Sequence, residues 1–297
     1  GPAMLFGVHL PQVGALGTRE NVLAFARGAE ELGFHSLWAS DHVVIPRHIA
    51  GEYAGGGRFP VPPDMPFLEP FSLLSFVAAA TQRILLGTSV IVLPMRNPIV
   101  TAKEVATLDV LSGGRVIFGV GAGWMAEEFE ALGVPFRGHG PRTDEYLEAV
   151  RRLWTEEDPS FRGRYVRVEG IGFAPKPLQK PHPPIWVGGM SEGALRRAGR
   201  YGDAWHATGT VDPDVLARCF ARVQEHARQA GRDPSRMLFS VRADRFLRGE
   251  PDQVLSVLES LRRIGVAHVL TAFPAPTIDE SLEQMERFAR QVVPALA

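Results

Sequence analysis

The stretch ILLGTSVIVLPMRNPIVTAKEVATLDVLSGGRVIFGV, residues 84–120, contains one complete strand–helix–strand unit. Its short apolar runs, Ile84–Leu93 and Val116–Val120, are typical of strands that are covered on both faces. Between them, Pro98–Leu111 has helical periodicity, opens with proline and is followed by two glycines. This order predicts parallel strands joined by a crossover helix.

The unit recurs about eight times along the 297 residues. The other strands are expected at Leu5–Leu10, Ser36–Ser40, Ile185–Gly188, Asp203–His206, Leu238–Ala243 and His268–Thr271. The other helices are expected near Thr18–Leu32, Pro70–Thr81, Pro141–Trp154, Glu192–Tyr201, Pro213–Ala230, Pro251–Ile264 and Ile278–Val293. Eight such pairs predict an α/β fold, a (β/α)8 TIM barrel. The competing architecture is an open doubly wound sheet, which would carry G-x-G-x-x-G after its first strand, and none follows Leu5–Leu10.

Two insertions extend the predicted barrel: Pro46–Phe67 after the second strand and Trp154–Pro184 after the fourth helix. The first includes the tract Gly55-Gly56-Gly57 and is too long for an ordinary βα loop, so we expect a mobile lid over the barrel mouth. Its apolar side chains would exclude water when it closes; they are Tyr53, Phe59, Met65 and Phe67. We expect one domain over residues 4–297, with residues 1–3 a remnant of an expression tag.

The charge balance excludes several classes of partner. Lys+Arg 32 against Asp+Glu 33 gives a net charge of −1, so no basic surface for nucleic acid or an anionic membrane is expected. No apolar run reaches the roughly 18 residues of a membrane span, and no export signal is apparent at the start. The single cysteine, Cys219, fits a reducing compartment. We therefore expect a cytoplasmic protein.

Residue types also exclude several chemistries that barrels support. Schiff-base catalysis needs a lysine at a strand end, but the three lysines lie in a helix and in the second insertion. Neither H-x-H nor H-E-x-x-H is present for zinc, and no G-x-S-x-G carries a nucleophilic serine. We expect no metal site, and infer that a cofactor supplies the chemistry.

Functional groups of a barrel gather where its strands end. The second strand is followed by Asp41 and His42, and an imidazole beside a carboxylate at this position is placed for proton transfer. A histidine bonded only within its loop is the alternative. His9 and His206 end two further strands and either line the pocket or are structural.

Glycines mark two other strand ends. Gly121, Ala122 and Gly123 follow the fourth strand and would let backbone approach a flat ligand, although a tight turn explains them as well. The segment Gly188-Gly189-Met190-Ser191 precedes a helix, where backbone amides and a hydroxyl form an anion site suited to phosphate, or an ordinary helix cap. Tyr146 and Arg142 could reach the same anion. The nearly uncharged third strand, which includes Ser89 and Val90, suits the face of a planar cofactor or simple core packing.

Taken together, these motifs resemble those of bacterial luciferase-like oxidoreductases, in particular the branch that uses the deazaflavin coenzyme F420. The resemblance runs through nearly the whole chain from Leu5. The segments that carry it are Leu37–Val44, Leu86–Val90, Asn97-Pro98, Ser112–Arg115, Phe118–Trp124, Arg142–Tyr146 and Pro183–Gly189.

The resemblance implies a barrel, usually dimeric, with the ring system at its mouth and a non-prolyl cis peptide at Ser89-Val90 that backs the reactive face. It further implies that Asp41 and His42 meet the polar edge of the ring or the substrate. The phosphate would be bound by Gly188, Gly189 and Ser191. Sugar-phosphate dehydrogenases of this group carry a glutamate where this chain has Trp124, which argues against a sugar phosphate as substrate.

We therefore expect hydride transfer between F420 and a small organic substrate, with His42 as general acid or base. The alternative is an FMN-dependent monooxygenase that uses reduced flavin and O2. A second alternative is a cofactor-binding homologue without catalysis, which would need neither the Asp41-His42 pair nor the long loop. Arginines favour F420, because its glutamate tail needs cationic donors beyond the phosphate; they are Arg137, Arg142, Arg196 and Arg197.

Overall fold

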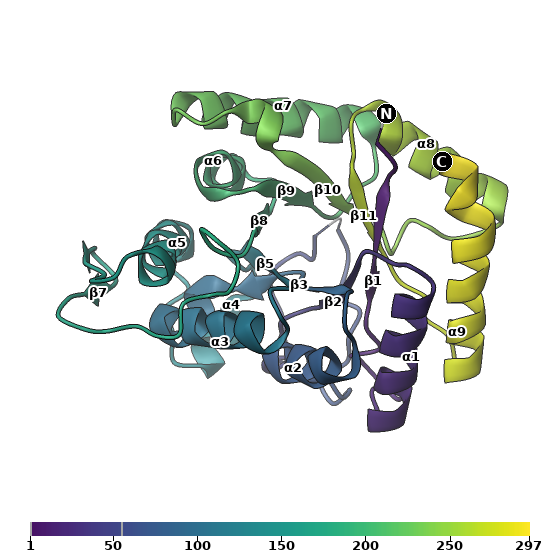
Figure 1. The fold of residues 1–297 in the computed structure, drawn as a ribbon, viewed down its shortest axis with the longest axis horizontal. Coiled ribbons are helices and arrows are strands. Elements are labelled where there is room, and N and C mark those ends of the chain that lie inside the picture. The colour runs from purple at the N-terminus through teal and green to yellow at the C-terminus, as the bar shows by residue number, and fades with distance from the viewer. Residues whose placement is uncertain (1, 55) are drawn as a thin grey trace.

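The structure is a computed structural model that describes residues 2–54 and 56–297. The proposed tag remnant and the Gly55-Gly56-Gly57 tract each include one residue outside this range. In the described chain, eight parallel strands close into a barrel because β3 pairs with both β2 and β5 (Figure 1). These strands are β1 (Leu5–His9), β2 (Ser36–Ala39), β3 (Leu85–Thr88), β5 (Val116–Gly121), β8 (Ile185–Gly188), β9 (Ala204–Ala207), β10 (Leu238–Arg242) and β11 (His268–Thr271). The predicted (β/α)8 barrel is confirmed.

Helices surround the strands on the outside, as Figure 1 shows. They are α1 (Arg19–Glu31), α2 (Pro70–Ala80), α3 (Pro98–Leu111), α4 (Ala126–Ala131), α5 (His139–Thr155), α6 (Glu192–Tyr201), α7 (Pro213–Gln229), α8 (Pro251–Arg263) and α9 (Ile278–Arg287). Several begin as the sequence predicts; the Asn97 side chain, for example, accepts from the amides of Ile99 and Val100 ahead of α3. The last helix is shorter than expected, because a π-helical turn replaces it from Phe288 to Val292.

The third strand differs from the continuous Ile84–Leu93 that the sequence predicts. It stops at Thr88, and the chain resumes as the short strand β4 (Ile91–Val92) after a cis peptide at Ser89-Val90, as the family resemblance implies. Gly119 of β5 lies directly against this break: Thr88 Oγ1 donates to its carbonyl at 2.7 Å and accepts from its amide at 2.9 Å. A Cβ on Gly119 would lie 1.6 Å from the Thr88 carbonyl oxygen, so only glycine fits there.

Two separate apolar layers support the barrel. The larger one lies between the strands and the helices, and the smaller one fills the interior with Trp38, Trp186, Ile117, Ala204 and Leu270. The Trp38 indole takes the space that side chains at residues 7 and 87 would occupy, because a Cβ on either glycine would come within 2.6 Å of it. The interior is thus packed below the level at which the strands end.

The second insertion contains a small antiparallel hairpin of β6 (Phe161–Arg162) and β7 (Arg167–Val168), apart from the barrel (Figure 1). Across the described residues, every helix is too short or too polar to cross a membrane.

Gly119→Ala is predicted to destabilise the protein by about 3 kcal/mol, because the added methyl group would overlap the Thr88 carbonyl. Urea unfolding measures the loss. Gly172→Ala is the control, since a Cβ there meets no atom within 4 Å. Equal stability of the two variants would show that the backbone relaxes freely at the break in the third strand.

Candidate functional site

The carboxyl ends of the strands surround a cavity of about 910 Å3. It brings together most of the side chains and glycines that the sequence singles out. Those lining it are His9, Asp41, His42, Ser89, Val90, Gly121, Ala122, Gly123, Gly188, Gly189, Met190, Ser191 and His206. Tyr146 packs against the larger apolar core and is not among the residues that line the cavity, so its contact with a ligand stays a prediction.

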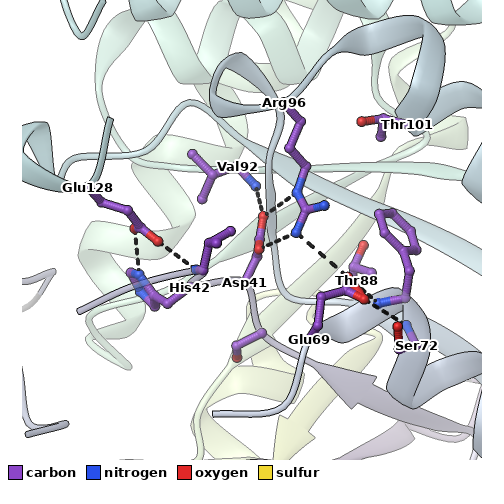
Figure 2. A network of polar contacts seen from close by, with 12 residues as sticks. Asp41, His42, Glu69, Ser72, Thr88, Val92, Arg96, Thr101 and Glu128 are labelled. Atoms are coloured by element: carbon purple, nitrogen blue, oxygen red, sulfur yellow. Dashed lines mark hydrogen bonds and ion pairs between the residues drawn. The ribbon is translucent and has the colours of Figure 1, made fainter. Parts of the chain in front are cut away.

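His42 is held by a carboxylate, but not by its neighbour in sequence. Its Nδ1 lies 2.8 Å from Glu128 Oε1, and the other oxygen of Glu128 accepts from the amides of Val43 and Val44 (Figure 2). The Glu128 side chain is 1% exposed and that of His42 13%. Glu128 is 86 residues from His42 in the sequence, so no local signal indicates this pair.

Asp41 turns instead to Arg96, as Figure 2 shows. Its carboxylate is fully buried, pairs with the Arg96 guanidinium at 2.6 and 3.0 Å, and accepts from the Val92 amide at 3.0 Å. Burial acts to lower the pKa of Arg96, but the hydrogen bonds and charge of Asp41 outweigh it and raise that pKa above its ordinary value. Because these groups occupy the carboxylate, Asp41 positions the chain. Asp41 also lines the cavity, and its contact with the ring or substrate stays a prediction.

The segment Pro46–Phe67 covers the cavity mouth with aromatic side chains. Tyr53 and Phe59 pack on each other and on Trp124, with ring centroids 5.3 to 5.9 Å apart, and Phe59 lies 4.8 Å from the His42 ring. Met65, the fourth expected apolar member, is 39% exposed instead. Two contacts hold the described part of the segment down: Glu127 accepts from the Ala50 amide, and Arg245 donates to the Ala54 carbonyl. Its mobility remains a prediction.

The cavity floor contains a cation that sequence reasoning missed. Arg242, at the end of β10, donates to the Ser89 carbonyl at 2.9 Å and to Ser40 Oγ at 3.0 Å. Burial acts to lower the pKa of Arg242, but paired Asp244 raises it above its ordinary value. Arg242 is the last residue of a barrel strand, where functional groups gather, and this position is the signal in the sequence that indicates it.

Two further histidines of the cavity, His9 and His206, are kept neutral at pH 7 by burial. Burial, helped by the charge of Arg242, lowers the pKa of His9 to about 4 and that of His206 to about 3. Both ring nitrogens of each are engaged: His9 with Leu10 and Ser40, His206 with Ser89 and Ser240. Neither is therefore placed to gain a proton easily.

At the opposite side of the cavity is the amino end of α6. Ser191 caps this helix by accepting from the Ala194 amide at 3.2 Å. Arg197, one turn further on, lines the cavity with its side chain 4% exposed, held by Asp144 and by the Gly140 carbonyl. The helix amino end and this guanidinium together suit an anion.

Of the other arginines that were expected near this anion, two are used elsewhere. Arg142 is buried and donates to the carbonyls of Pro94, Pro135 and Arg137, a structural role. Arg196 lines a separate groove on the outer surface. Only Arg197 of the proposed set lines the cavity in the described structure.

Between His42 and Arg197 the cavity wall is made of glycines around Val90. A Cβ on Gly121 would lie 2.7 Å from Val90, and one on Gly188 would lie 3.3 Å from it; on Gly123 it would lie 2.6 Å from Val92. The glycines therefore let the Val90 side chain stand at the centre of a wall that carries no other bulk. This surface fits the face of a planar ring.

Comparison with known proteins identifies a matching family and several relatives. A profile of the family described as luciferase-like monooxygenases matches residues 4–291. The uncharacterized protein Rv0953c of Mycobacterium tuberculosis is 34% identical over 273 residues, which cover 91% of this chain and 93% of that protein. An FMNH2-dependent dimethylsulfone monooxygenase of Pseudomonas putida is 29% identical over 214 residues, which cover 67% of this chain and 59% of that one.

Among solved structures, an F420-dependent secondary alcohol dehydrogenase in complex with an F420-acetone adduct superposes with a TM-score of 0.81. The match covers 100% of both chains at 20% sequence identity, so it shows a shared fold.

Asp41→Asn is predicted to destabilise the protein by about 3 kcal/mol, because it leaves the largely buried Arg96 guanidinium with only the more distant carboxylate of Glu69, at 3.8 Å. Urea unfolding gives the difference. Asp64→Asn removes a carboxylate from an exposed pair with Arg47, and we expect no measurable change. A stable Asp41→Asn variant would contradict a structural role for the buried pair.

Proposed function

The chain belongs to the luciferase-like monooxygenase family of oxidoreductases, and within it we propose hydride transfer between coenzyme F420 and a small organic substrate. The observation that carries the proposal is the arrangement of one cavity. A carboxylate-held imidazole lies at one side, an anion site with Arg197 at the other, and a flat glycine wall between them.

F420 supplies, when bound, a ring carbon that takes up or releases a hydride. Gly121, Gly188 and the Val90 side chain would hold the flat ring, and Arg197 with the amino end of α6 would hold the phosphate. Asp41 acts on this site by fixing the segment that carries Val92.

His42 is the proton-transferring residue in this proposal. Glu128 occupies its Nδ1, so Nε2 is the nitrogen that exchanges a proton with a bound substrate. In oxidation, Nε2 accepts the hydroxyl proton that the substrate loses as its hydride leaves; in reduction, the same nitrogen returns it. The buried Glu128 carboxylate stabilises the imidazolium that forms in the first case.

The substrate class follows from the covering segment. Phe59, Phe67 and Trp124 surround the space beside His42 with aromatic surface. Trp124 replaces the glutamate of sugar-phosphate dehydrogenases, so we propose a largely apolar carbonyl or alcohol rather than a sugar phosphate. By the same resemblance we propose that the protein is a cytoplasmic homodimer.

FMN with O2 remains the second candidate. The relative from Pseudomonas putida, whose name gives FMNH2 dependence, is the observation that favours it. A non-catalytic homologue is disfavoured, because the His42–Glu128 pair serves no binding role that a simpler polar residue would not fill.

His42→Ala is predicted to lower turnover by about 10² to 10⁴ while cofactor affinity stays nearly unchanged, because only the proton-transferring group is removed. Steady-state kinetics and fluorescence titration give the two quantities. His48→Ala, an exposed position of the same segment, is the control. Wild-type turnover in His42→Ala would remove His42 from the reaction.

F420 is predicted to bind at least about tenfold more tightly than FMN, a difference of about 1.4 kcal/mol. Quenching of tryptophan fluorescence measures both affinities, since Trp124 lines the cavity. Arg197→Ala is expected to weaken F420 binding, whereas Arg196→Ala, outside the cavity, is not. Tighter FMN binding together with O2-dependent turnover would favour the monooxygenase instead.

A further inference from the structure

Below the cavity, an unbroken chain of hydrogen bonds runs through the barrel interior. It begins at Ser89, which lines the cavity floor, and ends at His35, which is half-buried just before β2. Its members in order are Ser89, His206, Ser240, His268, Ser36 and His35. The successive contacts between hydroxyl oxygens and ring nitrogens are 2.9, 2.8, 2.9, 3.2 and 2.9 Å.

The sheet register produces this chain. His206, Ser240 and His268 are direct partners on the neighbouring strands β9, β10 and β11, and their side chains share the barrel interior. The contact from His268 to Ser36 has to pass β1, which lies between β11 and β2. Gly7 of β1 leaves that passage open, because a Cβ there would lie 2.8 Å from Ser36 Oγ.

His206 and His268 each use both ring nitrogens within the chain, and half-buried His35 uses one, Nδ1. The hydroxyl of Ser36 already accepts from the Trp38 indole at 2.7 Å, so it has one donor and one acceptor position left for its two histidines. One of these rings must therefore donate to Ser36 and the other must accept. Ser240 is under the same constraint, since its buried hydroxyl has His206 and His268 as partners.

Only two proton arrangements satisfy every member. In the first, the N–H groups are on His206 Nδ1, His268 Nε2 and His35 Nε2, and each hydroxyl donates toward His35. In the second, they are on His206 Nε2, His268 Nδ1 and His35 Nδ1. The hydroxyls of Ser36 and Ser240 then donate in the direction of Ser89, and Ser89 accepts from His206. All six groups are neutral in both arrangements.

We propose that this chain carries protons between the cavity and the opposite face of the barrel. Starting from the first arrangement, a proton received by the Ser89 hydroxyl displaces the one that Ser89 gives to His206. The displacement continues through Ser240, His268 and Ser36, until His35 gains a proton on Nδ1 and loses the one on Nε2 to water. One proton enters, one leaves, and the chain ends in the second arrangement.

The surroundings keep the histidines of the chain neutral, although its first hydroxyl also has a partner outside the chain: Arg242 donates to Ser89 Oγ at 3.3 Å. Burial lowers the pKa of His206 to about 3, that of His268 well below its usual value and that of His35 in the same direction. An imidazolium is thus disfavoured at each ring, as a concerted shift requires. Trp38 stacks on His206 at 5.3 Å, and Trp186 meets the His268 ring edge to face at 4.8 Å.

The need for such a path rests on the proposed function. Oxidation of an alcohol by hydride transfer leaves the hydroxyl proton inside the cavity, and the aromatic segment covers the direct route from the cavity mouth to water. The chain offers a second exit that does not depend on that segment opening.

The first test uses nitrogen-15 NMR of the histidine rings in the free protein. His35→Phe removes one hydrogen-bond partner of the Ser36 hydroxyl. This hydroxyl still accepts from the Trp38 indole, so His268 Nε2 is the acceptor left for its own proton. We expect the N–H groups of His268 and His206 to be on Nδ1 and Nε2, respectively, as in the second arrangement. His48→Phe is the control and is expected to leave both tautomers as in the wild type. The other tautomer at either ring in His35→Phe would overturn the proposal.

The second test compares the ring N–H groups of two fully buried residues, His268 and Trp38, each of which has a ring nitrogen in contact with Ser36. An indole nitrogen cannot accept a proton, so Trp38 takes no part in transfer. We expect the His268 ring N–H to exchange with deuterium at least about tenfold faster than the Trp38 N–H, which exchanges only when the barrel opens.

Variants of the second test distinguish exchange along the chain from exchange by opening of the barrel. His35→Phe combined with Ser240→Ala blocks the chain on both sides of His268, and we expect the exchange rate there to fall to that of Trp38. Ser281→Ala, at a buried serine outside the barrel interior, is the matched control. Equal protection of the two N–H groups in the wild type, or fast exchange in the double variant, would overturn the proposal. Neither measurement uses a cofactor, so failure of the proposed hydride transfer would be detected separately.

Discussion

The buried ion pair between Asp41 and Arg96 is the contact on which the site geometry depends. It joins the end of β2 to the chain that follows β3, and the same carboxylate fixes the Val92 amide. The position of Val90 in the cavity wall and the direction of His42 are both set within two residues of this contact. A solvated carboxylate could not impose such order, because water would compete for each of its hydrogen bonds.

Two acidic residues, Asp41 and Glu128, thus have the roles that the sequence pattern assigned to Asp41 alone. Asp41 organises the backbone, and Glu128 of α4 orients the imidazole. Adjacent residues at a strand end tend to point to opposite sides of the chain, so Asp41 and His42 meet different neighbours. Carboxylates also hold the cationic side chains of the cavity, since Arg197 and Arg242 are each paired with an aspartate.

The sequence predicts the barrel well because its signals are local. Apolar runs, helix caps and glycine positions each act over a few residues, and together they place every barrel strand of the described chain within a few residues of its true bounds. The glycines and Ser191 of the cavity are predictable for the same reason. Partners of a side chain are different: nothing near His42 or Arg142 indicates Glu128 or the three carbonyls that hold the arginine. Helical periodicity likewise gives the apolar face of the helix that carries Tyr146 but not the neighbours on which Tyr146 packs.

Trp38 reaches the barrel axis only because β1 and β3 each present a glycine to it. A side chain gained at Gly7 or Gly87 would displace the indole, and loss of the indole would leave a void that larger residues at those two positions could fill. Evolution can therefore change residues 7, 38 and 87 only as a set. We therefore expect related sequences either to keep the tryptophan with both glycines or to have replaced all three residues together.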